Sequence, residues 1–574
     1  MDEEVEVAAR PIISDLLRTL ANEAAQLRNR HSRLFDEAPF IPTFVSALAE
    51  GADQFGAVVA LENGYRLEAI LPLPREDYRQ DFEPAGDARF QVLLDQADRI
   101  LELPPQASGR DESYALAGRA TVAHCDILIA LWDGEPARGS GGTADVVSLA
   151  LRRGVPVIHL NPQMPDSSRI LWTGFSEFVD ATDMESMPQR DVEPRSLHAL
   201  VQAIIGPPGD LRRQTDLYNY LGEREKRLRT RVEYPLMLAL LGVKRPRAST
   251  FISAPYEEAT RCEWRPLHQA CEPDLKGVAE IFGEIEVSFA WADSLAQHYA
   301  QIYRSGHVLN FTFAAAAVLL ALLGLTLPQY HFVLAVAEPA VISVFVANTF
   351  FGSKRQWHRR WLEYRQLAER LRPMRSLKLL GVASPPSSER QGVRSQDGWI
   401  DWYARSVWRA AGCPSAALTN ARSLSGTIVR EELRPQVAYN TTNSGQMHTL
   451  DHRLHLTSIL LFAVTIIGCV TSVVVNLVLH DPQLSQNKVF VVVAAGLPAI
   501  GAAIFGIRMQ GDFGSTEERS RGTADNLNRI ADALEHPGVT LARSTDLVEA
   551  AAATMLNDVS EWRRAYQKRT LQLG

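Results

Sequence analysis

Length, composition and charge exclude several classes of protein before any motif is considered. The chain has 574 residues, is 46% hydrophobic and 22% charged, and carries a formal net charge of −8. This length predicts three or four domains. The mild acidity and the ordinary aromatic share of 8% argue against nucleic acid as a direct partner. The five cysteines lack CxxC and Cys/His spacing, so no metal site and no disulfide framework is predicted.

Residues 1–162 have the rhythm of an α/β domain. After a helical pattern over Val5–Arg30, short apolar runs alternate with helical patterns, which is typical of βαβ units. We expect an α/β, Rossmann-like domain with a doubly wound, mostly parallel sheet. The expected strands are Phe40–Val45, Arg66–Leu71, Arg99–Leu103, Asp126–Leu131 and Val155–Leu160, and the expected helices are Gln54–Glu62, Phe90–Ala97, Ser113–Cys125 and Thr143–Arg153.

Residues 163–300 predict a helical connector. Stretches rich in proline and charge, such as Gly206-Pro-Pro-Gly209 and Lys244-Arg-Pro-Arg247, separate helical patterns at Leu211–Arg231 and Glu284–Tyr303. No motif in this segment indicates a function.

Four apolar runs of the length that crosses a bilayer core follow the connector. They are Val308–Leu327, Phe332–Phe351, Leu454–Leu479 and Val489–Ile507. Positive residues lie beside the outer ends of each pair, whereas the tips between the runs carry almost none. The chain is therefore expected to be a multi-pass protein of the inner membrane, with both termini in the cytoplasm. We expect an all-α membrane domain with two related hairpins, in units 301–415 and 416–574.

The two membrane units repeat each other in sequence. The separations between matching landmarks stay constant to within one residue. The landmarks are Phe351-Gly-Ser353, Ala368, Trp399 and Tyr403 in the first unit, and Phe513-Gly-Ser515, Ala531, Trp562 and Tyr566 in the second. Each unit is expected to hold a membrane hairpin, a long amphipathic helix and a further helix that carries Trp and Tyr.

A few polar residues lie within the apolar runs. Glu338 is expected to face a bundle interior, a partner or water, or to lie near enough to the interface to reach it. Asn310, Asn348 and Asn476 are expected to make hydrogen bonds between helices, with a pore lining as the alternative.

The segment Ser46-Ala-Leu-Ala-Glu-Gly-Ala-Asp53 joins an expected strand to the next helix. In an open α/β sheet, ligands bind outside the carboxyl ends of the strands. Small residues let the backbone approach a ligand there, and the N–H groups that open the helix form an anion site. The alternative is a tight turn with no ligand.

A second segment, Trp132–Asp145, follows a later expected strand at the same edge. Its glycines permit a tight loop of phosphate size. Thr143 can cap the next helix and donate its hydroxyl, and Arg138 offers a guanidinium fork for phosphate. The two segments together favour a nucleotide-like ligand over two plain turns.

Both segments resemble the SLOG superfamily of Rossmann-like nucleotide binders. Ser46–Asp53 is similar to the Ser-Gly-x-Ala-x-Gly-x-Asp loop of DNA-processing protein A, and Gly141-Gly-Thr143 is similar to the Gly-Gly-x-Gly-Thr element of LOG phosphoribohydrolases. The resemblance covers residues 40–162 and implies a pocket for a nucleotide-derived ligand, with no other cofactor and no metal. The candidate binding residues are Ser46, Gly51, Asp53, Asp133, Gly134, Arg138, Gly139, Gly141, Gly142, Thr143 and Asp145.

Two departures from these families shape the functional expectation. LOG enzymes carry a catalytic Glu three residues after the Thr, where this chain has Val146. Binding without turnover is therefore expected; the alternative is a membrane-anchored N-glycosidase in which Asp145 or Asp133 supplies the carboxylate. The first strand of the families, which precedes the first helix, is also missing, so either the start is internal to a longer reading frame or the pocket is incomplete.

The membrane half resembles SLATT domains, which are membrane modules associated with SLOG proteins. The hairpin followed by Trp357–Leu371 carries this resemblance, with a second copy that ends in Trp562-Arg-Arg-Ala-Tyr566. It implies a pore-forming effector in bacterial stress or phage defence. The expected partners are a nucleotide-like molecule, the lipid bilayer and further copies of the chain, because four spans hardly form a wide pore alone.

Overall fold

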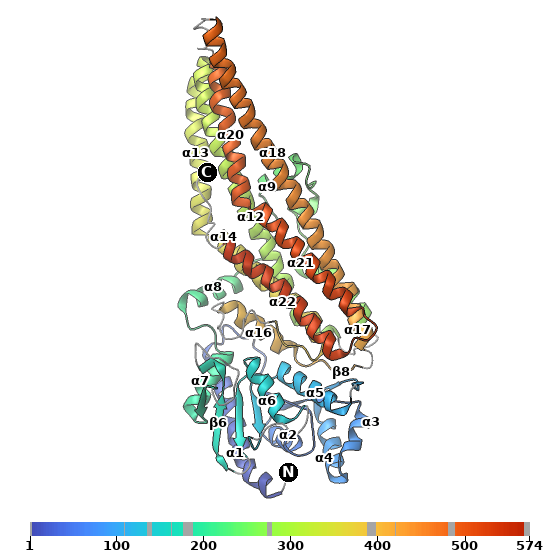
Figure 1. The fold of residues 1–574 in the computed structure, drawn as a ribbon. Helices are drawn as coiled ribbons and strands as arrows, with labels where there is room; N and C mark the ends of the chain where they lie inside the picture. Colours follow the sequence, from blue (N-terminus) through green and yellow to red (C-terminus); the bar gives the residue numbers. More distant parts are fainter. Residues whose placement is uncertain are drawn as a thin grey trace.

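The computed structural model describes residues 3–566 except 108, 135–140, 162–163, 176–186, 272–277, 387–397, 419–420 and 480–487. An α/β body occupies one end of the molecule, and a long rod of helices extends from it (Figure 1). Within the described residues, four helices are long and apolar enough to cross a membrane, and each covers most of one of the four predicted apolar runs.

The α/β body follows the predicted alternation of helices and strands. Its first elements, in chain order, are α1 (Glu3–Arg30), β1 (Thr43–Ser46), α2 (Ala52–Glu62), β2 (Arg66–Leu71), α3 (Arg75–Tyr78), α4 (Pro84–Asp95), β3 (Ala97–Glu102), α5 (Arg110–His124), β4 (Leu128–Leu131), α6 (Thr143–Arg152) and β5 (Val157–Asn161). All five predicted strands are present, because apolar runs between helical patterns are a strong local signal.

The strands form two sheets, which corrects the expectation of one doubly wound sheet. The first has the order β1-β2-β3-β8 and is parallel throughout. Its last strand, β8 (Ala416–Ala417), comes from the second half of the chain. The second has the order β4-β5-β6-β7, in which β4 and β5 are parallel and β6 (Met164–Leu171) and β7 (Gln189–Asp191) are antiparallel.

A gap separates the two sheets between β1 and β4. In the described part of the chain, β1 forms a ladder with β2 only and β4 with β5 only. Helix α1 packs across both sheets, because its buried side chains share one cluster with Phe44 of β1 and Ile129 of β4. Val45 and Leu128 border the same cavity. Most residues of β1 and β4 are accordingly half-buried, whereas β2 is buried along nearly its whole length.

The connector differs in part from the helical prediction. Strands β6 and β7 extend the second sheet, and α7 (Pro194–Ile205) packs against α1. Helix α8 (Leu211–Leu221) ends at Gly222, so the predicted helix to Arg231 is ten residues too long. Short helices follow: α9 (Glu233–Leu240), α10 (Ala248–Phe251) and α11 (Tyr256–Cys271).

The rod contains two series of helices. The first is α12 (Val278–Thr326), α13 (His331–Lys354), α14 (Trp357–Leu371), α15 (Met374–Leu380) and α16 (Trp399–Ala411), and the second is α17 (Ala421–Ile428), α18 (Arg434–Leu479), α20 (Lys488–Gly511), α21 (Phe513–Leu534) and α22 (Leu541–Tyr566). Helix α12 packs against α13, α14 and α20, and α18 packs against α20 and α21.

Each series contains the same backbone break after its second long helix. Gln356 between α13 and α14, and Asp512 between α20 and α21, both have left-handed φ angles, of 52° and 49°. The helix after the break has 15 residues in the first series and 22 in the second. Phe351-Gly-Ser353 lies before the break at Gln356, whereas Phe513-Gly-Ser515 lies after the break at Asp512. This landmark pair therefore does not match in the structure.

The polar residues at the span ends tie helices together. The Asn310 amide donates to Thr349 Oγ1 at 2.7 Å, and the Asn348 amide donates to Asn310 Oδ1 at 2.7 Å and to the Gly306 carbonyl at 3.1 Å. The predicted interhelical hydrogen bonds are therefore present for these two asparagines. Glu338 is half-buried, and the side chain of Asn476 lies outside the described residues.

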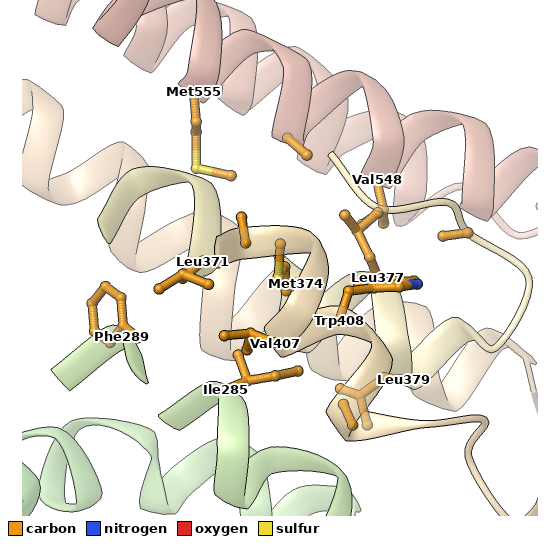
Figure 2. Close-up of a cluster of buried hydrophobic side chains, with 14 of the residues drawn as sticks. Ile285, Phe289, Leu371, Met374, Leu377, Leu379, Val407, Trp408, Val548 and Met555 are labelled. Atoms are coloured by element: carbon orange, nitrogen blue, oxygen red, sulfur yellow. The ribbon is translucent and has the colours of Figure 1, made fainter. Parts of the chain in front are cut away.

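One hydrophobic core joins the rod to the α/β body. It includes Ile70 of β2 and Leu101 of β3 together with side chains from the helices of the rod. Figure 2 shows part of this cluster, with Ile285, Phe289, Leu371, Met374, Leu377, Leu379, Val407, Trp408, Val548 and Met555 labelled. The sheet and the rod therefore share buried side chains, and the α/β body has further clusters of its own.

Candidate functional site

The first predicted segment is a tight loop between β1 and α2. The Leu48 N–H donates to Ser46 Oγ at 3.0 Å, and Leu48 itself has a left-handed φ of 55°. Gly51 is the N-cap of α2 with a φ of 103°, a conformation that favours glycine. The glycine N-cap therefore lets the chain turn tightly into α2, where the sequence predicts an anion site.

Asp53 holds this loop closed. It lies in the first turn of α2 and is half-buried. Burial raises the pKa of its carboxyl group, whereas the backbone N–H groups of Ala49 and Ala47 and the Ser46 hydroxyl oppose that rise in the pKa. Its carboxylate thus has partners within its own loop before any ligand binds.

The second predicted segment is described only at its two ends. Asp133 and Gly134 are exposed after β4; Arg138 and Gly139 lie outside the described residues. The Gly141 N–H donates to Asp145 Oδ2 at 3.0 Å. Gly142, rather than Thr143, is the N-cap of α6, and no side chain caps the helix. The prediction that Thr143 caps α6 is wrong because this residue is already the first of the helix.

Helix α5 brings the two loops to one region. A Cβ atom on Gly141, whose φ is 86°, would lie 2.6 Å from the backbone nitrogen of Ala115 in α5. The ring of Tyr114, the preceding residue of α5, lies 6.0 Å from the ring of Tyr78. The charge of Asp53 contributes to the raised pKa of the Tyr78 phenol. The N-terminal half of α5 therefore contacts both the second loop and the segment around Tyr78.

Four residues at this edge were missed by sequence reasoning: Tyr78, Asp81, Arg110 and Tyr114. The Tyr114 hydroxyl donates to Asp81 Oδ2 at 2.6 Å, and the Arg110 guanidinium pairs with the same oxygen. Tyr78 is fully buried, and its hydroxyl has no hydrogen-bond partner among the described residues. Burial, with Asp53 nearby, raises the pKa of this phenol. The sequence signal that could have found them is position, since Tyr78 and Asp81 lie in the short helical segment that follows the second strand.

Buried polar atoms are almost always hydrogen-bonded in folded proteins. The unpartnered hydroxyl of Tyr78 is therefore a place where a polar group of a ligand would complete a hydrogen bond. This arrangement can hold a polar ligand; among the described residues it contains no nucleophile with an adjacent base.

A cavity of about 2030 Å³ lies at the opposite edge of the sheets, between the α/β body and the rod. It is bordered by residues at the amino ends of β1 and β4, among them Thr43 and Leu128, and by much of α16. The predicted loops do not border it. This large space thus lies where the two parts of the molecule meet, away from the predicted ligand edge.

This junction cavity holds a buried lysine. Lys378 Nζ donates to the Gly412 carbonyl at 2.7 Å, lies 3.3 Å from His124 Nδ1 and is 3.9 Å from the centre of the Trp408 ring. Burial lowers the pKa of Lys378 to about 7 and lowers that of His124 well below its usual value. His124 Nε2 lies 3.0 Å from the Gly381 carbonyl oxygen, so this histidine is packed core.

The described residues contain no group of three or more His, Cys, Asp or Glu side chains that could hold a metal ion. No family model, no curated protein and no solved structure matches this chain. The resemblance to SLOG and SLATT proteins therefore stays a prediction, and function has to be argued from the geometry.

Proposed function

We propose that the protein is a membrane-anchored sensor and effector. A nucleotide-derived signal binds the α/β body at the carboxyl edges of its two sheets, and the resulting change gates a pore or disrupts the bilayer, in a bacterial stress or phage-defence response. The oligomer that such a pore needs forms from copies of this chain.

The observation that supports the proposal is the pairing of the first sheet with a strand from the rod half of the chain. Strand β8, which follows α16, pairs with Leu101 and Glu102 of β3. The Leu418 N–H donates to the Glu102 carbonyl at 2.8 Å, and the Arg99 guanidinium donates to the carbonyls of Ala411 and Cys413 at 2.8 and 2.9 Å. A shift of β3 therefore moves the end of α16.

The chemical class of the ligand is inferred from the groups at the carboxyl edges of the sheets. Two helices, α2 and α6, begin there with glycine N-caps and no side-chain cap, which leaves N–H groups for anionic oxygens. Arg110, which pairs with Asp81, contributes a guanidinium, and the Tyr78 hydroxyl adds a buried polar group without a partner among the described residues. A phosphate-bearing molecule with polar groups matches this set.

The test is leakage of a dye from liposomes that contain the full-length protein, with and without a panel of linear and cyclic nucleotides. We expect one nucleotide to trigger leakage, and Gly142→Arg to abolish the response because a long side chain then fills the N-terminus of α6. Gly142 has a φ of −69°, so the substitution adds no backbone strain. Gly522→Arg, on an exposed helical site in α21 with open space around it, is the control for added charge.

The second candidate is an anchored N-glycosidase, favoured by the exposure of Asp133 and Asp145 beside the second loop. It predicts release of a free base from the nucleotide and loss of that activity in Asp145→Asn. Nucleotide consumption without leakage would replace the sensor proposal by this one, and a panel without leakage or consumption would contradict both.

A further inference from the structure

The connector contains a closed loop, Arg227–Ser253, that carries α9. A β-bridge between Leu228 and Ile252 closes it. The Arg229 N–H donates to the Phe251 carbonyl at 2.8 Å, and the Ser253 N–H donates to the Arg227 carbonyl at 2.9 Å. We call residues 227–253 the α9 loop.

The α9 loop lies against the ends of the membrane-length helices. Its Tyr234, together with Met237 and Leu238, packs in one cluster with Val308 of α12, Leu454 of α18 and Ile507 of α20. These three are terminal residues of the predicted apolar runs. Figure 1 shows α9 beside α12 and α18, part of the way along the rod. The helix therefore lies level with the start of the apolar zone on the side of the α/β body.

Hydrogen bonds fix the α9 loop at this level. The Tyr234 N–H donates to the buried Ser305 Oγ at 3.2 Å. The Arg231 guanidinium donates to Asn348 Oδ1 at 2.8 Å, and the Gln301 amide donates to the Arg231 carbonyl at 2.8 Å. Because these bonds reach α12 and α13, the loop keeps its position relative to the spans.

The outer side of α9 is also apolar. Leu236 is 54% exposed, Leu240 is 79% exposed and Val232 is 49% exposed. A short helix with apolar side chains on both its inner and outer sides is typical of one that is covered on all sides. The rod covers only the inner side, so the outer leucines need another apolar environment.

The flanks of α9 are basic. Between residues 224 and 247 the chain has eight Lys or Arg residues and two Glu residues. Lys244, Arg245 and Arg247, shortly after α9, are all exposed. Exposed leucines next to a basic cluster, at the level where the spans begin, match the interface of a bilayer with anionic lipid.

We infer that the α9 loop is an interfacial anchor: Leu236 and Leu240 enter the leaflet nearest the α/β body, and Lys244, Arg245 and Arg247 bind phosphate groups of anionic lipid. The continuity of α9 with the span ends and its charge favour lipid over a second copy of the chain. This inference rests on the four spans and is independent of the nucleotide proposal.

The test places a fluorophore at position 240 in nanodiscs, on the thiol introduced by Leu240→Cys in the full-length protein, whose exposed Cys262 and Cys469 are replaced by Ser. Lipids brominated near the headgroup are expected to quench this label at least about twofold more than a label introduced by Val92→Cys. Val92 is 58% exposed on α4 in the α/β body. A label introduced by Val336→Cys, at a site 55% exposed on α13, reports quenching within the spans.

Charge is tested in the same assay with the triple variant Lys244→Gln, Arg245→Gln, Arg247→Gln. We expect quenching at position 240 to rise with the fraction of phosphatidylglycerol in the parent protein and to lose that dependence in the variant. Quenching at position 240 no stronger than at position 92 would overturn the inference. Efficient disulfide cross-linking of Leu240→Cys between copies without quenching would assign the leucines to a protein interface instead.

Discussion

Lys378 links the stability of the junction to pH. Its pKa falls from 10.5 to about 7 on burial, so between these values the unfolded chain holds a proton that the folded chain has released. The free energy of unfolding therefore rises with pH from about 7 to 10.5, by at most about 1.4 kcal/mol per pH unit. Glu68, whose pKa is raised by burial, contributes with the opposite sign at lower pH.

We expect Lys378→Met to flatten this pH dependence and to stabilise the protein most near pH 7. Chemical unfolding in detergent between pH 7 and pH 9.5, followed by tryptophan fluorescence, measures the slope. Lys244→Met, at an exposed position, serves as the matched control and should leave the slope unchanged. An unchanged slope in Lys378→Met would show that the buried amine does not release its proton.

Two separate constraints favour glycine at position 141: its φ of 86° and its close contact with α5. Gly64 has a similar φ of 79° with open space around it. Gly64→Ala is expected to cost about 1–2 kcal/mol of stability, which is the effect of the backbone alone. Gly141→Ala is expected to cost clearly more, because its Cβ atom would lie 2.6 Å from the Ala115 nitrogen. Thermal unfolding of the two variants separates these contributions; equal costs would mean that α5 moves aside freely.

At the scale of elements, the gap between β1 and β4 has a dynamic consequence. Among the described residues each of these strands carries a ladder on one edge, and both border the junction cavity, whereas β2 is paired on both edges. Backbone N–H groups without ladder partners exchange with solvent through small local openings.

Hydrogen exchange measured by mass spectrometry is therefore expected to show faster exchange in peptides that cover β1 and β4 than in those that cover β2. Peptides that cover β5, which is also paired on both edges, provide the control in the second sheet. Equal protection of β1 and β2 would mean that something fills the gap in solution.

At the scale of the molecule, the shared core predicts one cooperative unit outside the bilayer. Leu101 of β3 is fully buried in the cluster that also contains Leu377 and Trp408 of the rod. Leu101→Ala is expected to cost about 2–4 kcal/mol and to destabilise the sheet and the soluble helices together.

Two probes check this: tryptophan fluorescence, which Trp408 and its neighbours in the rod dominate, and thiol labelling of Cys125, which is half-buried between α5 and β4. Both transitions should shift together in Leu101→Ala. A shift of the Cys125 transition alone would show that the α/β body unfolds separately from the rod.

Features that depend on local patterns could be predicted from the amino-acid sequence. Apolar periodicity located the five strands and most of the helices, and run length located the four membrane-length helices. Glycine placement located the loops at Gly51 and Gly141. These features follow from interactions between residues close in the chain, which a window of sequence contains.

Which distant segments meet became clear only in the folded molecule. The two-residue strand β8 gives no periodic signal, so its pairing with β3 could not be predicted, and neither could the split into two sheets. Tyr78 is of interest because its hydroxyl is buried without a hydrogen-bond partner among the described residues, and Lys378 because its amine is buried. The exposed Leu240 suggests a membrane contact only because the structure places α9 beside the ends of the spans. Each depends on contacts made by residues far apart in the chain, which composition and spacing do not encode.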